Sequence, residues 1–424
     1  MILDFSKNNF RLIFEITEDN TVILKDFSRV PYTQTKSHKA QWCSIADIHV
    51  CGENPDDHHF FKHTGASRST TLKYVSHDLY QTEDGERLEF HLQDSSLSVT
   101  VIYCFYHGID AIRTWLRVEN ISEKCLGLEY VSSFSYTGID EGDAPADEKM
   151  RVFLPHNAWM REVNWKEYSL SELGFEKTFK FSSKRISVTG NGSFSSKEYL
   201  PMGAVSNLEA ANTLMWQIEN NGAWHWEISD IADMLYLKLS GPTEQDNHWY
   251  KCLEKGEVFE SVPVCVAVAE DFDRALAQMT AYRRKISAKN EFEKQCPVIF
   301  NDYMHCLKAN PTEATLLPVI DRAAEIGAEY YCMDAGWYAS GTWWECVGEW
   351  LPVESRFPHG IKYIFDYIRS KGMIPGIWLE IEVMGIQCPL AKQFGDECFF
   401  MRHGKRIIDH GRYLLDFRNK KVRD

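Results

Sequence analysis

The chain has 424 residues, 44% of them hydrophobic and 25% charged, which is typical of a globular protein long enough for two domains. With 46 basic and 61 acidic residues, its formal net charge is −15, which argues against a nucleic acid or an anionic membrane as the main partner. We find no secretory signal pattern and no run of about 18 apolar residues, and the twelve irregularly spaced cysteines favour a reducing compartment over a disulfide framework.

Residues 1–268 have the pattern of many short antiparallel strands. The stretch RLEFHLQDSSLSVTVIYCFY (87–106) alternates apolar and polar residues on both sides of Asp94-Ser95-Ser96, which predicts a hairpin. Similar alternation recurs with Asn-Gly and Gly-Pro punctuation between the segments. This half is therefore predicted to be a large β-sandwich.

From residue 269 the pattern changes. Residues 269–294 have helical periodicity, with Phe272, Leu276, Met279 and Tyr282 on one face, and we expect a helical linker there. Residues 295–424 then alternate strands and helices, which predicts parallel βαβ units. The predicted strands are 297–302, 328–334 and 373–382, and the predicted helices are 310–327, capped by Asn310, and 360–372.

Polar and aromatic residues follow each predicted parallel strand. Tyr303 follows the first, Asp334 ends the second, and Trp378 and Glu380 lie near the end of the third. The carboxyl ends of parallel strands carry the functional groups of such folds. The stretch YYCMDAGWYASGTWWECVGEW (330–350) combines carboxylates with many tryptophans, which suits a ligand with apolar faces and polar edges, such as a sugar.

The motifs MDAGWY, GEW, RFPHGIKYIFDYIRSKGMIPGIWLEIEV and GRYLLDFRNKKVRD resemble glycoside hydrolase family 36, the α-galactosidases and their relatives. In the first half, LPHNAWMREVNW and SSKEYLPMG resemble the β-supersandwich domain of that family. The resemblance implies a multidomain fold: an all-β supersandwich (1–268), the linker, and the first three or so units of a (β/α)8 TIM barrel (295–424). It also implies a retaining hydrolase of terminal α-linked galactose, as in melibiose or raffinose.

The resemblance implies roles for several residues. Asp334 matches a position that binds galactose hydroxyls, and Trp378 matches an aromatic lining of the sugar subsite. Further substrate-binding candidates are Tyr303, Trp337, Trp350, Glu380, Asp56 and Asp57. Glu380 and Glu382 are expected on one strand face, where two carboxylates cannot flank a bond from opposite sides.

The sequence departs from the family at Ala335, where an adjacent second Asp is usual. An α-N-acetylgalactosaminidase or another α-galactoside-processing enzyme therefore stays open as an alternative. The nucleophile and the acid/base are expected beyond Asp424, so we assign no catalytic residue and expect an N-terminal portion that is inactive alone. A non-catalytic carbohydrate-binding or assembly fragment is the second alternative.

The stretch HVCGENPDDHHFFKH (49–63) contains residue types that bind metals. Its spacing fits no zinc pattern, and we assign no metal to it. No cofactor is implied, because two carboxylates suffice for glycoside hydrolysis. By resemblance we expect a cytoplasmic homotetramer that binds a small oligosaccharide.

Overall fold

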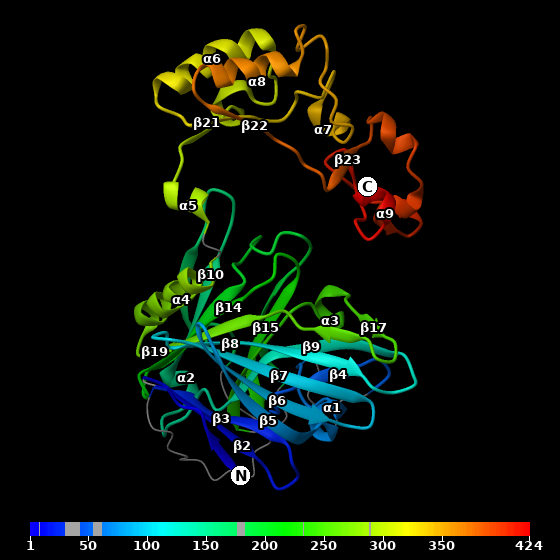
Figure 1. The fold of residues 1–424 in the computed structure, drawn as a ribbon. Coiled ribbons are helices and arrows are strands. Elements are labelled where there is room, and N and C mark those ends of the chain that lie inside the picture. Colours follow the sequence, from blue (N-terminus) through cyan, green and yellow to red (C-terminus); the bar gives the residue numbers. More distant parts are fainter. Residues whose placement is uncertain (8, 30–42, 54–61, 176–182, 232, 288–289) are drawn as a thin grey trace. The chain divides into compact units, whose positions relative to one another are not determined.

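The computed structural model describes residues 1–7, 9–29, 43–53, 62–175, 183–231, 233–287 and 290–424 (Figure 1). The chain forms two compact units, Met1–Ser287 and Ala288–Asp424. The domain limits at 268 and 294 stay a prediction.

The largest sheet of unit 1 is antiparallel and has ten strands. Its order is β11 (Asn164–Ser169), β10 (Met150–His156), β13 (Met202–Asn207), β14 (Asn212–Ile218), β19 (Val264–Ala269), β8 (Ala111–Asn120), β7 (Leu97–Tyr106), β6 (Gly85–Gln93) and β5 (Lys73–Thr82), with β18 (Val258–Glu260) also beside β8. Strands β6 and β7 are the hairpin predicted at 87–106, with Gln93 opposite Ser98, so this prediction is confirmed.

Two smaller sheets complete the β structure of unit 1. One has the order β12 (Arg185–Gly190), β15 (Trp224–Ile231), β16 (Met234–Ser240), β9 (Leu126–Thr137) and β17 (Lys251–Leu253), with β4 (Ile48–Val50) also beside β9. The other contains β1 (Ile2–Asp4), β2 (Arg11–Ile16) and β3 (Val22–Ser28). The short helices are α1 (Ser67–Thr71), α2 (Ala146–Lys149) and α3 (Glu244–Asn247).

Aromatic contacts join the sheets of unit 1 into one core. Trp216 of β14 packs edge-on against Trp226 of β15 at a centroid distance of 4.9 Å, and both rings are fully buried. The ring centroid of Phe14 in β2 lies 4.8 Å from that of Phe90 in β6. Sheets whose inner faces interdigitate in this way form a sandwich, as predicted.

Helix α4 (Phe272–Ile286) covers part of the largest sheet (Figure 1). Asp271 caps its first turn by accepting a hydrogen bond from the Arg274 N–H. Its buried face consists of Ala275, Met279 and Tyr282 and packs on strands β14 and β19. Helix α4 lies within the segment 269–294 that was expected to be a helical linker, and it belongs to unit 1.

Unit 2 contains three parallel strands in sequential order, β20 (Ile299–Asn301), β21 (Tyr330–Met333) and β22 (Ile374–Ile377). Helices α6 (Glu313–Glu325) and α8 (Ile361–Ser370) connect them and lie side by side (Figure 1). Leu316 and Ile320 of α6 and Ile364 and Ile368 of α8 are fully buried. Sequential parallel strands joined by helices are the arrangement that starts a barrel, so the predicted fold class is confirmed.

The remaining elements of unit 2 are short. They are α5 (Glu291–Gln295), the kinked turn η1 (Tyr303–Leu307), α7 (Trp343–Cys346), β23 (Val383–Gly385), η2 (Pro389–Lys392), η3 (Asp396–Cys398), β24 (Met401–Arg402), β25 (Lys405–Arg406), β26 (Ile408–Asp409), β27 (Arg412–Leu414) and α9 (Lys420–Arg423). Strands β23, β27 and β26 form a separate antiparallel sheet.

Two boundary predictions in unit 2 are wrong. Thr312, not Asn310, caps α6, because its hydroxyl and that of Thr315 form a reciprocal capping box. Asn310 instead accepts a hydrogen bond from Arg356. The third strand ends at Ile377 rather than at 382, because the chain beyond Trp378 turns away and pairs with β27.

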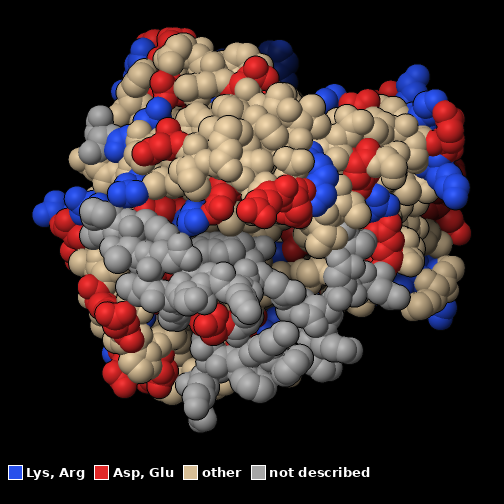
Figure 2. Space-filling view, turned by 90° about the horizontal axis from the view of Figure 1, so that it is seen from below, with Lys and Arg blue, Asp and Glu red and all other residues tan. Residues whose placement is uncertain are grey.

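Acidic and basic side chains are interspersed on the face drawn in Figure 2, where the described residues form no continuous basic patch. This distribution agrees with the net charge of −15. Among the described helices, none combines the length and the apolar character that a membrane crossing requires.

The core of unit 1 leaves no room for a side chain at Gly203. Gly203 of β13 is paired with Trp216 of β14, and a Cβ at this position would overlap the indole ring. We predict that Gly203→Ala lowers the free energy of unfolding by about 1–3 kcal/mol, the usual cost of overpacking. Urea denaturation monitored by tryptophan fluorescence measures the loss.

Gly222→Ala is the matched control for this prediction. A Cβ at Gly222 would lie 3.5 Å from its nearest neighbour, the side-chain amide of Asn220, which is an ordinary contact distance. Equal unfolding midpoints for the two variants would contradict the prediction.

Candidate functional site

The tips of the first two parallel strands are joined by hydrogen bonds around Asp334. Asn301 ends β20, and its Nδ2 donates to Asp334 Oδ2 at 2.7 Å. The backbone N–H of Asp334 donates to Asp302 Oδ1 at 2.9 Å. The pairing places the amide and the two carboxyl groups at one edge of the sheet.

The third tip reaches the same edge through its backbone. The N–H of Trp378 donates to the carbonyl oxygen of Met333 at 2.9 Å, and Met333 directly precedes Asp334. The ring centroid of Trp378 lies 5.6 Å from that of Trp343, and the ring centroid of Tyr303 lies 6.0 Å from that of Trp343. Side chains from all three predicted strand ends therefore converge.

Further aromatic side chains support Trp378. Trp337 donates its indole N–H to the Trp378 carbonyl at 3.2 Å, and Trp350 lies 6.1 Å from the Trp378 ring. Tyr338 is stacked on the Trp378 ring at 6.4 Å. Trp337 and Tyr338 are buried, at 3% and 7% exposure, whereas Trp350 and Trp378 are half-buried. The buried pair packs, and the half-buried pair has surface left for a ligand.

Asp302 lies beneath this edge as a buried carboxyl group. It is 1% exposed, and the Tyr331 hydroxyl donates to its Oδ2 at 3.1 Å. Burial raises the pKa of Asp302 to about 6, and the negative charge of Asp334 acts in the same direction. Asp302 holds the backbone of Asp334 and is itself withdrawn from solvent.

Asp334 keeps capacity to bind hydroxyl groups. Its Oδ1 accepts the Ala335 N–H at 2.7 Å and its Oδ2 accepts from Asn301, which leaves further lone pairs of the four on the carboxylate. The partner Asn301 is exposed. A carboxylate, an amide and aromatic ring faces together match the hydroxyl edges and the C–H faces of a hexose.

The sequence predicted that Glu380 and Glu382 share one strand face, and this prediction is wrong. The strand ends before both residues, and Glu380 Oε2 instead accepts a hydrogen bond from Arg412 Nη1 at 2.6 Å. The Arg412 guanidinium also lies over the Trp344 ring at 4.5 Å. This ion pair fastens the segment after Trp378 to β27.

Two of the candidates from the sequence, Asp56 and Asp57, lie outside the described residues. Asn301, Asp302 and Arg412 were not singled out as site residues from the sequence. Asn301 and Asp302 could have been identified because they directly follow an apolar strand. Nothing near Arg412 in the sequence indicates that it pairs with Glu380.

The buried Asp302 generates a pH prediction. Its pKa of about 6 in the folded state lies above the usual aspartate pKa of 3.8, so between these pH values the folded state holds more protons than the unfolded state. Asp302 therefore lowers the free energy of unfolding as pH rises from 4 to 6, by roughly 3 kcal/mol. We expect Asp302→Asn to remove this decline and to equal or exceed the parent chain in stability above pH 6.

Urea denaturation at pH 4, 5, 6 and 7 measures the difference. In Asp302→Asn, the amide oxygen of the new side chain can still accept a hydrogen bond from the Asp334 N–H, so the link between the two strand tips is retained. Asp366→Asn on α8 is the control, because Lys362 lowers the pKa of that carboxyl group and the decline should persist there. An Asp302→Asn variant that is less stable by the same amount at every pH contradicts the prediction.

Three kinds of comparison bear on this arrangement. Residues 261–424 match the family model Melibiase. The chain is 27% identical over 364 residues to α-galactosidase Mel36A of Lactobacillus acidophilus, covering 83% of this chain and 47% of that protein. The crystal structure of the GH36 α-galactosidase AgaB of Geobacillus stearothermophilus aligns with a TM-score of 0.80 at 16% identity, covering 99% of this chain and 61% of that one.

A variant of AgaA from the same organism, solved in complex with raffinose, aligns with a TM-score of 0.79 at 15% identity, over 100% of this chain and 62% of that one. The chain spans about half the length of Mel36A and AgaA, two of the curated relatives that it matches. The chain is therefore similar to the Melibiase family over residues 261–424 and to about half the length of curated α-galactosidases, and it shares its fold with the matching part of glycoside hydrolase family 36 structures.

Proposed function

We propose that the protein is a retaining α-galactosidase and that the described strand tips bind its terminal galactose. The observation that carries this proposal is the convergence of Asn301, Asp334 and Trp378 at one edge of three parallel strands. Such an edge is where (β/α)8 enzymes keep their sites. In this assignment Asp334 and Asn301 bind hydroxyl groups, and Trp378 stacks on the C–H face of the ring.

Neither of the other carboxyl groups at this edge suits the chemical steps. A retaining enzyme places its nucleophile and acid/base roughly 5–5.5 Å apart on opposite sides of the bond. Asp302 is buried and Glu380 is paired with Arg412, so neither is free to approach a sugar. We assign both to positioning, and we assign neither to the catalytic pair.

The proposed substrates are oligosaccharides that end in α-linked galactose. AgaA variants of G. stearothermophilus were crystallised with raffinose and with stachyose, and this chain shares their fold. A neutral sugar also suits a protein of net charge −15. The cytoplasmic location and the tetramer stay predictions.

Preference for galactose over N-acetylgalactosamine is part of the proposal. Ala335 is the position that kept the N-acetylgalactosamine alternative open. Its side chain is 1% exposed, and its backbone N–H donates a hydrogen bond to Asp334 Oδ1. Competition between p-nitrophenyl α-galactoside and its N-acetyl analogue, with the whole protein, tests this preference. Faster hydrolysis of the N-acetyl compound would favour the alternative.

We predict that the 424-residue chain binds galactose and that Asp334→Asn weakens the binding by about 10- to 100-fold. This range corresponds to the loss of a hydrogen bond to a charged group. Galactose titration monitored by tryptophan fluorescence measures the affinity, because Trp378 and Trp350 are half-buried at the proposed site.

Asp366→Asn serves as the matched control, because it removes an exposed carboxylate of the same unit on α8. Glucose serves as the control sugar. Equal weakening in both variants, or equal affinity for both sugars, would count against the assignment of Asp334. If the whole protein hydrolyses the substrate but this chain does not bind galactose, the proposed activity stands and the galactose subsite must consist of other residues.

A further inference from the structure

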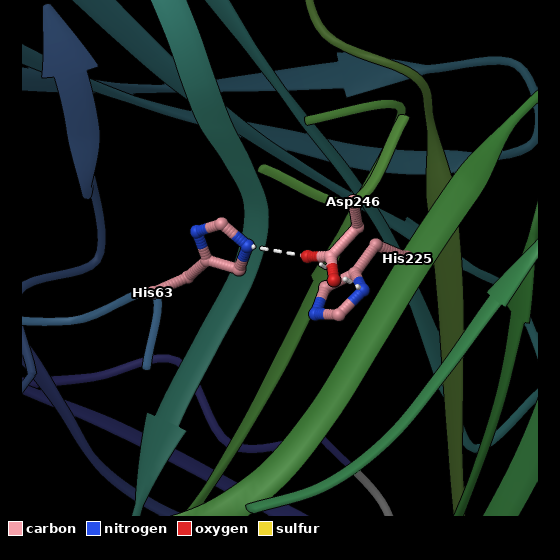
Figure 3. A group of neighbouring side chains, drawn as sticks. All are labelled: His63, His225 and Asp246. Carbon is pink, nitrogen blue, oxygen red and sulfur yellow. Dashed lines mark hydrogen bonds and ion pairs between the residues drawn. The ribbon is translucent and has the colours of Figure 1, made fainter. Parts of the chain in front are cut away.

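Unit 1 contains a cluster of two imidazoles and a carboxylate from three distant segments (Figure 3). His63 precedes α1, His225 lies on β15, and Asp246 lies in α3. His63 Nε2 is 2.9 Å and His225 Nδ1 is 3.5 Å from Asp246 Oδ2. One possible ligand atom from each residue lies within 4.8 Å of the others, so the three can contact a common ion.

The cluster is shielded on most sides but reaches the surface at one point. His63 and His225 are 2% and 1% exposed, whereas the side chain of Asp246 is 15% exposed. The ring of His63 is stacked on Tyr130 at 4.4 Å, which fixes its orientation. The partly exposed Asp246 gives an ion a path of entry.

Neighbouring groups hold the ligand atoms in place. His225 Nε2 lies 3.3 Å from Glu227 Oε2 and donates a hydrogen bond to that carboxylate, which leaves Nδ1 as an acceptor that the Thr189 hydroxyl contacts at 2.7 Å and that an ion can take over. Arg185 Nη2 donates to Asp246 Oδ1 at 2.7 Å, which leaves Oδ2 facing the two imidazoles. A carboxylate behind a ligating histidine and a hydrogen-bonded ligating carboxylate are typical supports of metal sites.

The charges in the cluster also favour a cation. His225 Nδ1 and Asp246 Oδ2 are 3.5 Å apart, a separation at which both atoms can bind the same ion. The two carboxylates of Glu227 and Asp246 share the single guanidinium of Arg185. A divalent ion bound to Nδ1 and Oδ2 offsets the second negative charge.

We propose that His63, His225 and Asp246 bind a divalent transition-metal ion of the Zn²⁺ class. Two imidazole nitrogens and one carboxylate oxygen suit such an ion and leave a fourth position for water or for the Thr189 hydroxyl, which lies 2.7 Å from His225 Nδ1. The ion joins β15, α3 and the chain before α1. It has no part in the proposed glycoside hydrolysis, and the two proposals can fail independently.

Co²⁺ titration of the chelator-treated 424-residue chain tests the proposal. We expect one Co²⁺ per chain, with the visible absorption of a four-coordinate ion, and displacement by Zn²⁺. X-ray absorption of the Zn²⁺ form should show nitrogen and oxygen neighbours at ~2.0–2.2 Å and no sulfur. These measurements use the unsubstituted chain, so they do not depend on the folding of a variant.

Asp246→Asn should abolish the visible bands, and Glu227→Gln should weaken binding about 10- to 100-fold, as expected for a group that orients a ligand. Asp78→Asn is the matched control. Asp78 accepts from His91 Nε2 at 3.1 Å on an exposed part of β5 and β6, in the same type of pair without a second imidazole. It should bind Co²⁺ like the unsubstituted chain.

A second group of possible ligands must be separated from the first. Cys51, Cys125 and Cys252 line a surface pocket of about 450 Å³ together with Glu129 and Glu244. Binding there would produce sulfur-to-cobalt charge-transfer bands that vanish in Cys125→Ser/Cys252→Ser. That result, or Co²⁺ bands that persist in Asp246→Asn, would overturn the proposal, as would a failure to bind Co²⁺ and Zn²⁺.

Discussion

The parallel pairing of β20, β21 and β22 is the constraint on which the candidate site depends. Asn301 lies opposite Cys332, and Met333 lies opposite Ile377, so the three strands end at nearly the same level. Side chains that are about 30 and 75 positions apart in the sequence therefore meet at one edge. A shift of one residue in either pairing would turn Asp334 or Trp378 toward the opposite face.

A second constraint is electrostatic. Asp302 and Asp334 lie side by side and are both buried, at 1% and 9% exposure, and burial makes the charged form of Asp302 costly. Asp334 is the more exposed of the two carboxyl groups and is therefore the better placed to meet a ligand. Asp302 accepts a hydrogen bond from the backbone N–H of Asp334. This bond holds Asp334 in place without occupying the carboxylate oxygens of Asp334.

The sequence predicted what depends on local periodicity. The hairpin of β6 and β7, the amphipathic helices α4 and α8 and the three parallel strands follow from alternation or from helical spacing. The polar residues at the strand ends were visible for the same reason. Trp378 and Asp334 were identified with the help of a family resemblance, and their convergence required the pairing of the strands.

What could not be predicted depends on distant partners. The third strand ends early because Glu380 pairs with Arg412 and β23 pairs with β27, and neither partner is visible from the segment itself. The same holds for unit 1. The stretch around His63 fits no metal-binding spacing, because its partners His225 and Asp246 follow more than 160 residues later. Local spacing detects sites whose ligands share one turn or helix, whereas a site assembled across a sandwich is determined by how its strands and connecting segments pack.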